Sequence, residues 1–113
     1  MKKISSDNNS KYEHSKKCIA YEYGIDNECC SICRSVIAGR YPKQDYIVNK
    51  QVDEILYIVQ GNGIIASDNQ IIHFNANDVI TIGKGEKFYF DAHAVVVAIC
   101  TPPWYASQHI ETK

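Results

Sequence analysis

The sequence predicts an all-β protein: a single small antiparallel β-barrel of the jelly-roll type, also called a double-stranded β-helix. Three observations lead to this prediction. Stretches rich in β-branched and aromatic residues recur along the chain, turn residues separate them about every eight to twelve positions, and no stretch has a convincing helical period. Short strands at this spacing are typical of β-sandwiches and β-barrels.

Composition narrows the class of protein. A chain of 113 residues is long enough for one domain, and 45% apolar with 22% charged residues is ordinary for a soluble globular protein. A net charge of -1 gives no electrostatic reason to expect nucleic acid or a membrane as partner. The longest apolar run, Ala94 to Cys100, is too short to span a bilayer, and no leader sequence is recognisable, so we expect a cytoplasmic protein. The five cysteines are then expected to be reduced thiols.

The beginning of the chain looks different from the rest. Residues 1–17 combine five lysines with serine and asparagine and have almost nothing to bury. Such a segment cannot repay the entropy of ordering itself. We therefore expect a flexible N-terminal tail over residues 1–17 and a barrel domain over residues 18–113.

Strands are expected wherever apolar or aromatic residues alternate between turns. The first covers Cys18 to Tyr23, and the second covers Glu28 to Ala38 until Gly39 and Pro42 break it. In the second, Arg34 falls on one face and Cys33 on the other. Later strands are expected at 52–60, 64–66, 71–74, 79–82, 87–90 and 94–100, with turns at 61–63, 67–70, 75–78, 83–85 and 91–93, followed by a terminal segment that packs back through Trp104.

Two stretches carry a family resemblance. The first, residues 52–63, places Glu54 at the head of a β-rich run that ends at Gly61 and Gly63, and the second, residues 77–88, contains an Asn-Asp-hydrophobic-turn-Gly pattern. Together they resemble the two signature motifs of the cupin superfamily. The resemblance covers roughly residues 39–109, because the Cys-x-Pro-Pro-aromatic step at Cys100 to Trp104 is similar to the end of many small single-domain bacterial cupins. It implies the barrel fold and a ligand site inside the barrel.

The resemblance does not extend to the metal-binding histidines. Metal-binding cupins have a His-x-His pair shortly before the glutamate and a third histidine in the second motif; here the earlier positions hold residues 47–50, Ile-Val-Asn-Lys, and the later one holds Phe88. Only Glu54 remains of four ligands, and one carboxylate does not hold a transition metal. We therefore expect no metal and no other cofactor.

The cysteine cluster has two interpretations. Cys30 and Cys33 form a Cys-x-x-Cys that, with Cys29, is half of a zinc site or a redox pair if further ligands come from elsewhere. On an alternating strand, however, residues three apart point to opposite faces. The alternative interpretation is that these cysteines are small buried hydrophobic residues.

Glu54 is the main candidate for chemistry. A carboxyl group inside an apolar barrel should have a raised pKa, which suits a general acid or base at neutral pH. The competing hypothesis is structural: Glu54 is ionised and paired with Arg34 or Arg40, or is hydrogen-bonded to Asn49.

The sequence supports two functions. One is metal-independent binding of a small polar or sugar-like ligand in the barrel. The other is a metal-independent sugar-phosphate or nucleotide-sugar isomerase or epimerase in which Glu54 moves a proton. The resemblance implies a histidine base and a tyrosine acid for such an enzyme, from His73 or His93 with Tyr41, Tyr57 or Tyr89. A homodimer is expected in either case. The predicted site residues are Arg34, Tyr41, Asn49, Glu54, Phe88, Phe90 and Trp104.

Overall fold

The longest strand of the barrel is β8 (Lys87–Thr101), and its sequence explains why it is central. In the computed structural model, which describes residues 1–113, buried residues alternate with half-buried or exposed ones along the whole of β8. This is the pattern of a strand with one face against a core. One edge of β8 pairs with β3 (Ser31–Tyr41) and the other with β5 (Asp53–Ala66), both antiparallel. The buried side chains of β8 are Phe88, Phe90, Ala92, Ala94, Val96, Ala98 and Cys100.

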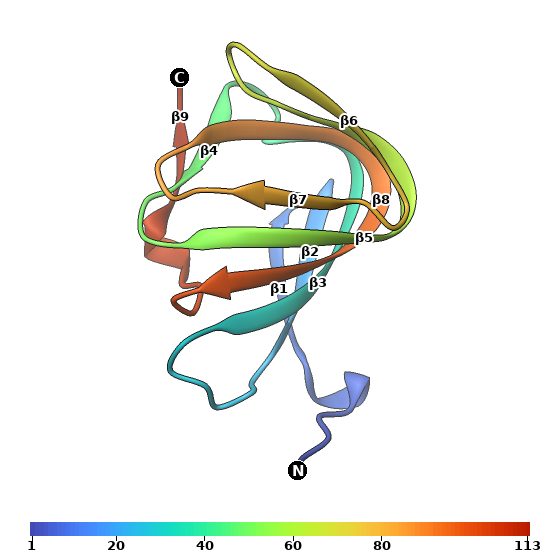
Figure 1. Cartoon of the computed structure of the whole chain (residues 1–113), viewed down its shortest axis with the longest axis vertical. Helices are drawn as coiled ribbons and strands as arrows, with labels where there is room; N and C mark the ends of the chain where they lie inside the picture. Colours follow the sequence, from blue (N-terminus) through green and yellow to red (C-terminus); the bar gives the residue numbers. More distant parts are fainter.

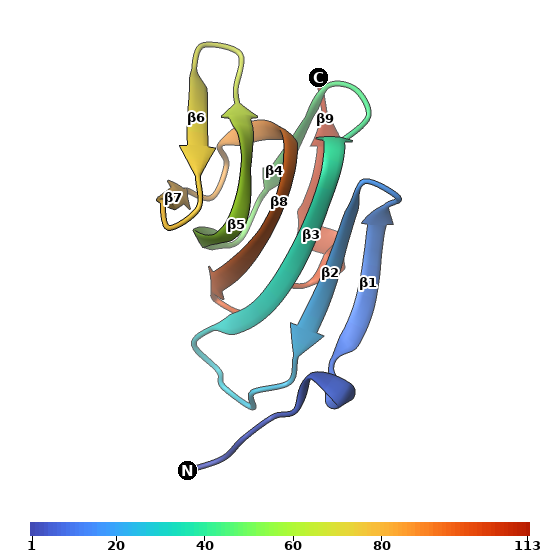
Figure 2. The same cartoon turned by 90° about the vertical axis from the view of Figure 1, so that its right-hand side faces the viewer.

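The remaining strands extend the sheet from these three and curl it into an open barrel. Beyond β3 follow β2 and β1, and β5 also pairs with β6 and β7. On the opposite side, β4 pairs with both the start of β8 and β9 (Figures 1 and 2). This architecture confirms the predicted all-β antiparallel barrel. The other strands are β1 (Ser10–Ser15), β2 (Cys18–Tyr23), β4 (Tyr46–Asn49), β6 (Ile71–Asn75), β7 (Val79–Ile82) and β9 (His109–Thr112), with 3-10 helices η1 (Ser6–Asn8) and η2 (Ala106–Gln108).

Two of the expected turns are absent. Strand β5 runs through residues 61–63 and β8 runs through residues 91–93, so each is one long bent strand rather than two short ones. Gly61 has φ +88°, and a Cβ atom there would lie 2.1 Å from the backbone oxygen of His93. The glycine therefore serves the close approach of β5 to β8 beside a bulge after Ile58, not a hairpin turn.

The expected N-terminal tail is also wrong over Ser10–Ser15. These residues form β1, which pairs with β2. The physical reason is aromatic packing that composition does not reveal: the rings of Tyr12 and His14 lie 5.1 and 5.5 Å from the ring of Trp104, measured between centroids. The boundary expected at Lys17 thus falls inside the sheet.

Smaller differences concern strand ends. Strand β3 continues past Gly39 to Tyr41, and two strands were not predicted, β4 and β9, which pair with each other through four residues each. Strands β2 and β7 have the predicted bounds. Neither 3-10 helix has the length or the apolar sequence that crossing a bilayer requires.

We predict that Gly61→Ala destabilises the protein by about 3 kcal/mol, because the added methyl group collides with the backbone of β8 and the backbone conformation disfavours alanine. The measurement is the urea midpoint of unfolding. Gly24→Ala is the matched control, since nothing lies within 4 Å of its Cβ position. Equal midpoints for the two variants would contradict the assigned role of Gly61.

Candidate functional site

The barrel encloses a cavity of about 50 Å³ between its two curved faces. Its floor is apolar, built from inward-facing residues of β3, β5 and β8, and its polar groups come from several elements that are far apart in the sequence. Glutamate, histidine, tyrosine and cysteine side chains all meet there. The residues that line it with polar or aromatic groups are His14, Glu22, Ser31, Cys33, Ser35, Tyr41, Glu54, Phe88, Phe90, Cys100, Trp104 and His109.

Glu54 points into this cavity from the start of β5. The residue keeps some accessible surface, which opens into the cavity, but protein atoms surround the carboxyl group and burial raises its pKa to about 7. The Cys100 thiol donates to Glu54 Oε2 across 3.6 Å. Neither arginine neutralises the carboxyl, because Arg34 lies 4.6 Å over the ring of Tyr21 and Arg40 lies 3.9 Å over the ring of Tyr89. The hypothesis of an arginine-paired Glu54 is therefore wrong.

A second polar group of the site is a tyrosine between two histidines. Tyr41 Oη lies 2.9 Å from His109 Nε2 and 3.4 Å from His14 Nδ1. Burial lowers the pKa of each histidine to about 4 and raises the pKa of Tyr41 above its usual range. At neutral pH all three side chains are uncharged, so they interact as hydrogen-bond donors and acceptors rather than as ions.

Asn49 contacts His109 at Nδ1, the ring nitrogen that does not contact Tyr41. It is 1% exposed, and its Oδ1 lies 2.8 Å from His109 Nδ1 and 3.1 Å from Gln108 Nε2. Its Nδ2 has no partner within hydrogen-bond distance but is close enough to Glu54 to lower the carboxyl's pKa. The Asn49 amide thus lies between the histidine–tyrosine group and the carboxyl.

Aromatic rings close the mouth of the cavity. Trp104 lies 5.6 Å from His109 and 5.5 Å from His14, measured between ring centroids, and Tyr12 covers Trp104 from outside. On the floor, Phe88 and Phe90 pack edge to face at 5.4 Å. These rings add flat apolar surfaces to the lining of the cavity beside its polar groups.

Three buried cysteine thiols also line the cavity. Burial raises the pKa of Cys18 and of Cys33 to about 12, and that of Cys100 is also raised. All three stay protonated at neutral pH and are poor nucleophiles. Cys29 and Cys30 lie in the loop before β3, away from this cavity, so the Cys-x-x-Cys does not converge on one point.

The structure brings most of the sequence-predicted site residues together. Tyr41, Glu54, Phe88, Phe90 and Trp104 line the cavity, and Asn49 lies directly behind His109. Arg34 does not line it, because it is on the outward-facing side of β3.

The histidines that contact Tyr41 are not the two that were predicted as candidates. His73 and His93 are exposed, and the Tyr57 hydroxyl donates to Asn77 on the surface. The histidines that meet Tyr41 are His14 and His109, which sequence reasoning assigned to terminal segments. Glu22 was also missed, although its parity with buried Cys18 and Ala20 on a correctly predicted strand would have found it.

The residues present do not fit the metal centre that the cupin frame implies. Ile47 and Phe88 stand at ligand positions and pair across β4 and β8, where they are 1% and 4% exposed. No three histidine, cysteine, aspartate or glutamate side chains are grouped closely enough to hold a metal ion. A donor set of one carboxylate and one amide is too small for a transition metal.

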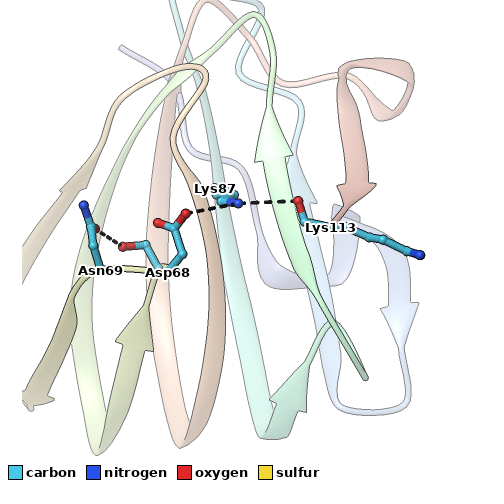
Figure 3. A network of polar contacts seen from close by, with 5 residues as sticks. Asp68, Asn69, Lys87 and Lys113 are labelled. Carbon is cyan, nitrogen blue, oxygen red and sulfur yellow. Dashed lines mark hydrogen bonds and ion pairs between the residues drawn. The ribbon is translucent and has the colours of Figure 1, made fainter.

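A second, larger hollow of about 340 Å³ lies beside the hairpin between β5 and β6. It is open to solvent, and two of its charged groups pair: Lys87 Nζ lies 3.2 Å from Asp68 and 3.4 Å from the Lys113 carbonyl oxygen, while the Ser67 hydroxyl donates to Asn69 (Figure 3). Phe88 borders both hollows. The smaller inner cavity has the buried titratable groups, so it is the candidate site.

Comparison with known proteins shows a fold shared with solved structures but no match in sequence. No protein-family model and no curated protein sequence matches the chain. Among solved structures, a uridine-bound variant of Streptomyces PAC13 superposes with a TM-score of 0.87 at 14% identity, covering 100% of this chain and 91% of that one. A further Pac13 structure, described as a unique nucleoside dehydratase, gives 0.87 at 13% identity, covering 100% and 92%. Ectoine synthase from P. lautus gives 0.69 at 17% identity, covering 88% and 78%. The chain therefore has the cupin fold.

We predict that the free energy of unfolding of wild type relative to Glu54→Gln falls by about 3 kcal/mol between pH 4.5 and pH 7.5. The folded state of wild type holds the Glu54 proton more tightly than the unfolded state does, so this stability is present below pH 4.5 and lost as pH rises through about 7. His14 and His109 act in the opposite direction over pH 4 to 6.5, because their pKa values are lowered on folding, but both proteins contain them. Urea unfolding across this pH range measures the difference. A constant difference would mean that Glu54 titrates normally.

Proposed function

We propose that the inner cavity binds a small polar, sugar-like ligand without the help of a metal ion, and that nucleosides are the first class to test. The observation that carries the proposal is the convergence of uncharged hydrogen-bonding groups, His14, Tyr41 and His109, with Glu54 between aromatic rings. Flat apolar faces combined with a few oriented polar groups suit a ring that carries hydroxyl groups. The fold shared with uridine-bound PAC13 supports the choice of nucleosides.

Ligand entry requires movement at the mouth. A free volume of about 50 Å³ holds a few water molecules and no ring. The groups that must move are Trp104 and the end of β1, which carries His14 and Tyr12. Strand β1 is the edge strand of the sheet and pairs only with β2, so its displacement breaks that pairing and the packing of Tyr12 and His14 on Trp104 but leaves the other strands paired.

A second candidate function is proton transfer on the bound ligand, as in an isomerase, epimerase or dehydratase. The specific observation in its favour is the carboxyl of Glu54, whose pKa of about 7 suits a general acid or base at neutral pH. The Tyr41 hydroxyl, hydrogen-bonded to His109, is a second group that can exchange a proton with a ligand.

Titration calorimetry with uridine, combined with assay for altered nucleoside, tests both functions on Glu54→Gln. If the protein only binds, we expect the variant to lose about tenfold in affinity, the effect of one hydrogen bond, with no product from either protein. If it is an enzyme, we expect affinity within a few-fold of wild type and at least a hundredfold loss of turnover.

The matched control is His93→Gln, because His93 is exposed on the outside of β8 and should change neither quantity. Tyr41→Phe should weaken binding of the same ligand. Failure of uridine, other nucleosides, sugar phosphates and nucleotide sugars to bind wild type would overturn the proposed ligand class.

We also propose that the protein is a homodimer through the outer face of β5, β8 and β3. The register aligns apolar side chains in rows across these strands, such as Ile55 beside Ile99 and Ile32. Ile55 and Tyr57 are 43% and 42% exposed. Arg34 is the one charged residue among the outward-facing positions of β3 from Ile32 to Val36, of β8 from Val95 to Ile99 and of β5 from Ile55 to Tyr57. Monomers rarely expose a continuous apolar face of this kind, and a twofold axis buries it against itself.

Ile55→Glu should therefore convert a dimer to a monomer in sedimentation velocity, because it introduces a charge into that face. Ile71→Glu is the control, since Ile71 is 62% exposed on β6, outside the proposed interface. A wild-type protein that sediments as a monomer at high concentration would refute the dimer.

A further inference from the structure

The direction of the hydrogen bonds behind the cavity follows from one backbone amide. The N–H of Gln51 donates to Gln108 Oε1 across 3.2 Å, and a backbone N–H is a donor only. The other end of the Gln108 amide is therefore Nε2, which donates to Asn49 Oδ1 across 3.1 Å. Gln108 is 3% exposed, so water does not offer an alternative partner.

The orientation of Asn49 in turn determines the tautomer of His109. Asn49 Oδ1 is an acceptor only, so the His109 Nδ1 atom that lies 2.8 Å away must have the hydrogen. A neutral imidazole has one N–H, which leaves a lone pair on Nε2. That lone pair accepts from the Tyr41 hydroxyl across 2.9 Å.

The hydrogen-bond chain continues one residue further, to His14. The single proton of the Tyr41 hydroxyl is directed at His109, so towards His14 the Tyr41 oxygen is an acceptor. His14 Nδ1, at 3.4 Å, must then be the N–H of that ring. The lone pair of His14 is left on Nε2, which has no hydrogen-bond partner in the protein, and His14 lines the cavity.

We propose that Gln108 and Asn49 are positioning residues that fix the direction of this hydrogen-bond chain, so that His14 Nε2 presents an acceptor to a ligand. A ligand meets it with a hydroxyl or N–H donor, such as a sugar hydroxyl, and not with a carbonyl or phosphate oxygen. The statement about the ligand rests on the proposed function. The arrangement of protons on the two histidines does not.

The chain also connects to Glu54. With Asn49 Oδ1 turned towards His109, its Nδ2 is turned towards the Glu54 carboxyl and lowers that group's pKa. If the amide turned over, its oxygen would face Glu54 instead and disfavour ionisation. The tautomers of His109 and His14 and the protonation of Glu54 are therefore coupled through one side-chain amide.

Nitrogen-15 NMR of the histidine rings tests the proposal, because protonated and unprotonated imidazole nitrogens have well-separated shifts. For the wild-type protein at pH 8 we expect His109 and His14 both to be neutral with the hydrogen on Nδ1. Exposed His73 and His93 serve as internal references in the same spectrum. The hydrogen on Nε2 of either buried ring would overturn the proposal without any variant.

Gln108→Glu gives the sharper result. The introduced carboxylate still accepts from Gln51 N–H but cannot donate to Asn49, so the Asn49 amide should turn over and donate to both neighbours. His109 Nδ1 must then accept, the Tyr41 hydroxyl turns towards His14, and both rings change to the Nε2–H form. Unchanged tautomers in a folded variant would overturn the proposal.

Asn49→Asp is the matched second variant, since an aspartate oxygen keeps the acceptor. We expect both tautomers to stay as in wild type, while the negative charge raises the pKa of His109 above its value of about 4. The raised pKa shows that the new charge lies beside His109, and the tautomers report on positioning, so a change of either tautomer in a folded Asn49→Asp protein would overturn positioning by the Asn49 oxygen. Uridine added to wild type should shift the His14 Nε2 signal; loss of this shift alone, with correct tautomers, would contradict only the ligand statement.

Discussion

The pairing of β5 with β8 is the constraint on which the site depends. It runs from Asp53 opposite Thr101 to Ala66 opposite Tyr89 with one shift at the bulge after Ile58, so the register of this pairing determines which side chains of two long strands face inwards. A slip by one residue would turn every side chain of β5 to the other face. In the observed register Glu54 faces inwards beside Cys100, and the outward positions become the apolar outer face.

Local pattern was enough to predict the fold class and several strands, but not the long-range geometry. Strands β2 and β7 were predicted with their observed bounds, because alternation and flanking turn residues are local signals. The glycines of β5 gave the wrong prediction for a physical reason. A glycine in a turn and a glycine under a neighbouring strand look alike in sequence, and only the packing of Gly61 against His93 distinguishes them.

The residues of the site were predictable only where they lie in one of the two motifs or on a strand with alternating apolar residues. Glu54, Phe88 and Phe90 followed from the two motifs. His14 and His109 did not, because their partner Tyr41 is 27 and 68 residues away along the chain. They meet only because β1 adds to the edge of β2 and β9 adds to β4, and nothing in either short segment indicates the strand that it joins.

Burial also determines which titratable groups of the cavity are charged at neutral pH. Desolvation keeps His14 and His109 neutral and keeps Tyr41 and the three buried thiols protonated, so these groups do not change charge near neutral pH. Glu54 is different, since the same burial brings its pKa to about 7. The cavity therefore gains a negative charge through Glu54 as pH rises past 7, and a bound ligand that donates a hydrogen bond to this carboxyl would favour the charged form. Binding of such a ligand and proton release by Glu54 would then be linked, so the ligand would lower the pKa of the carboxyl that it contacts.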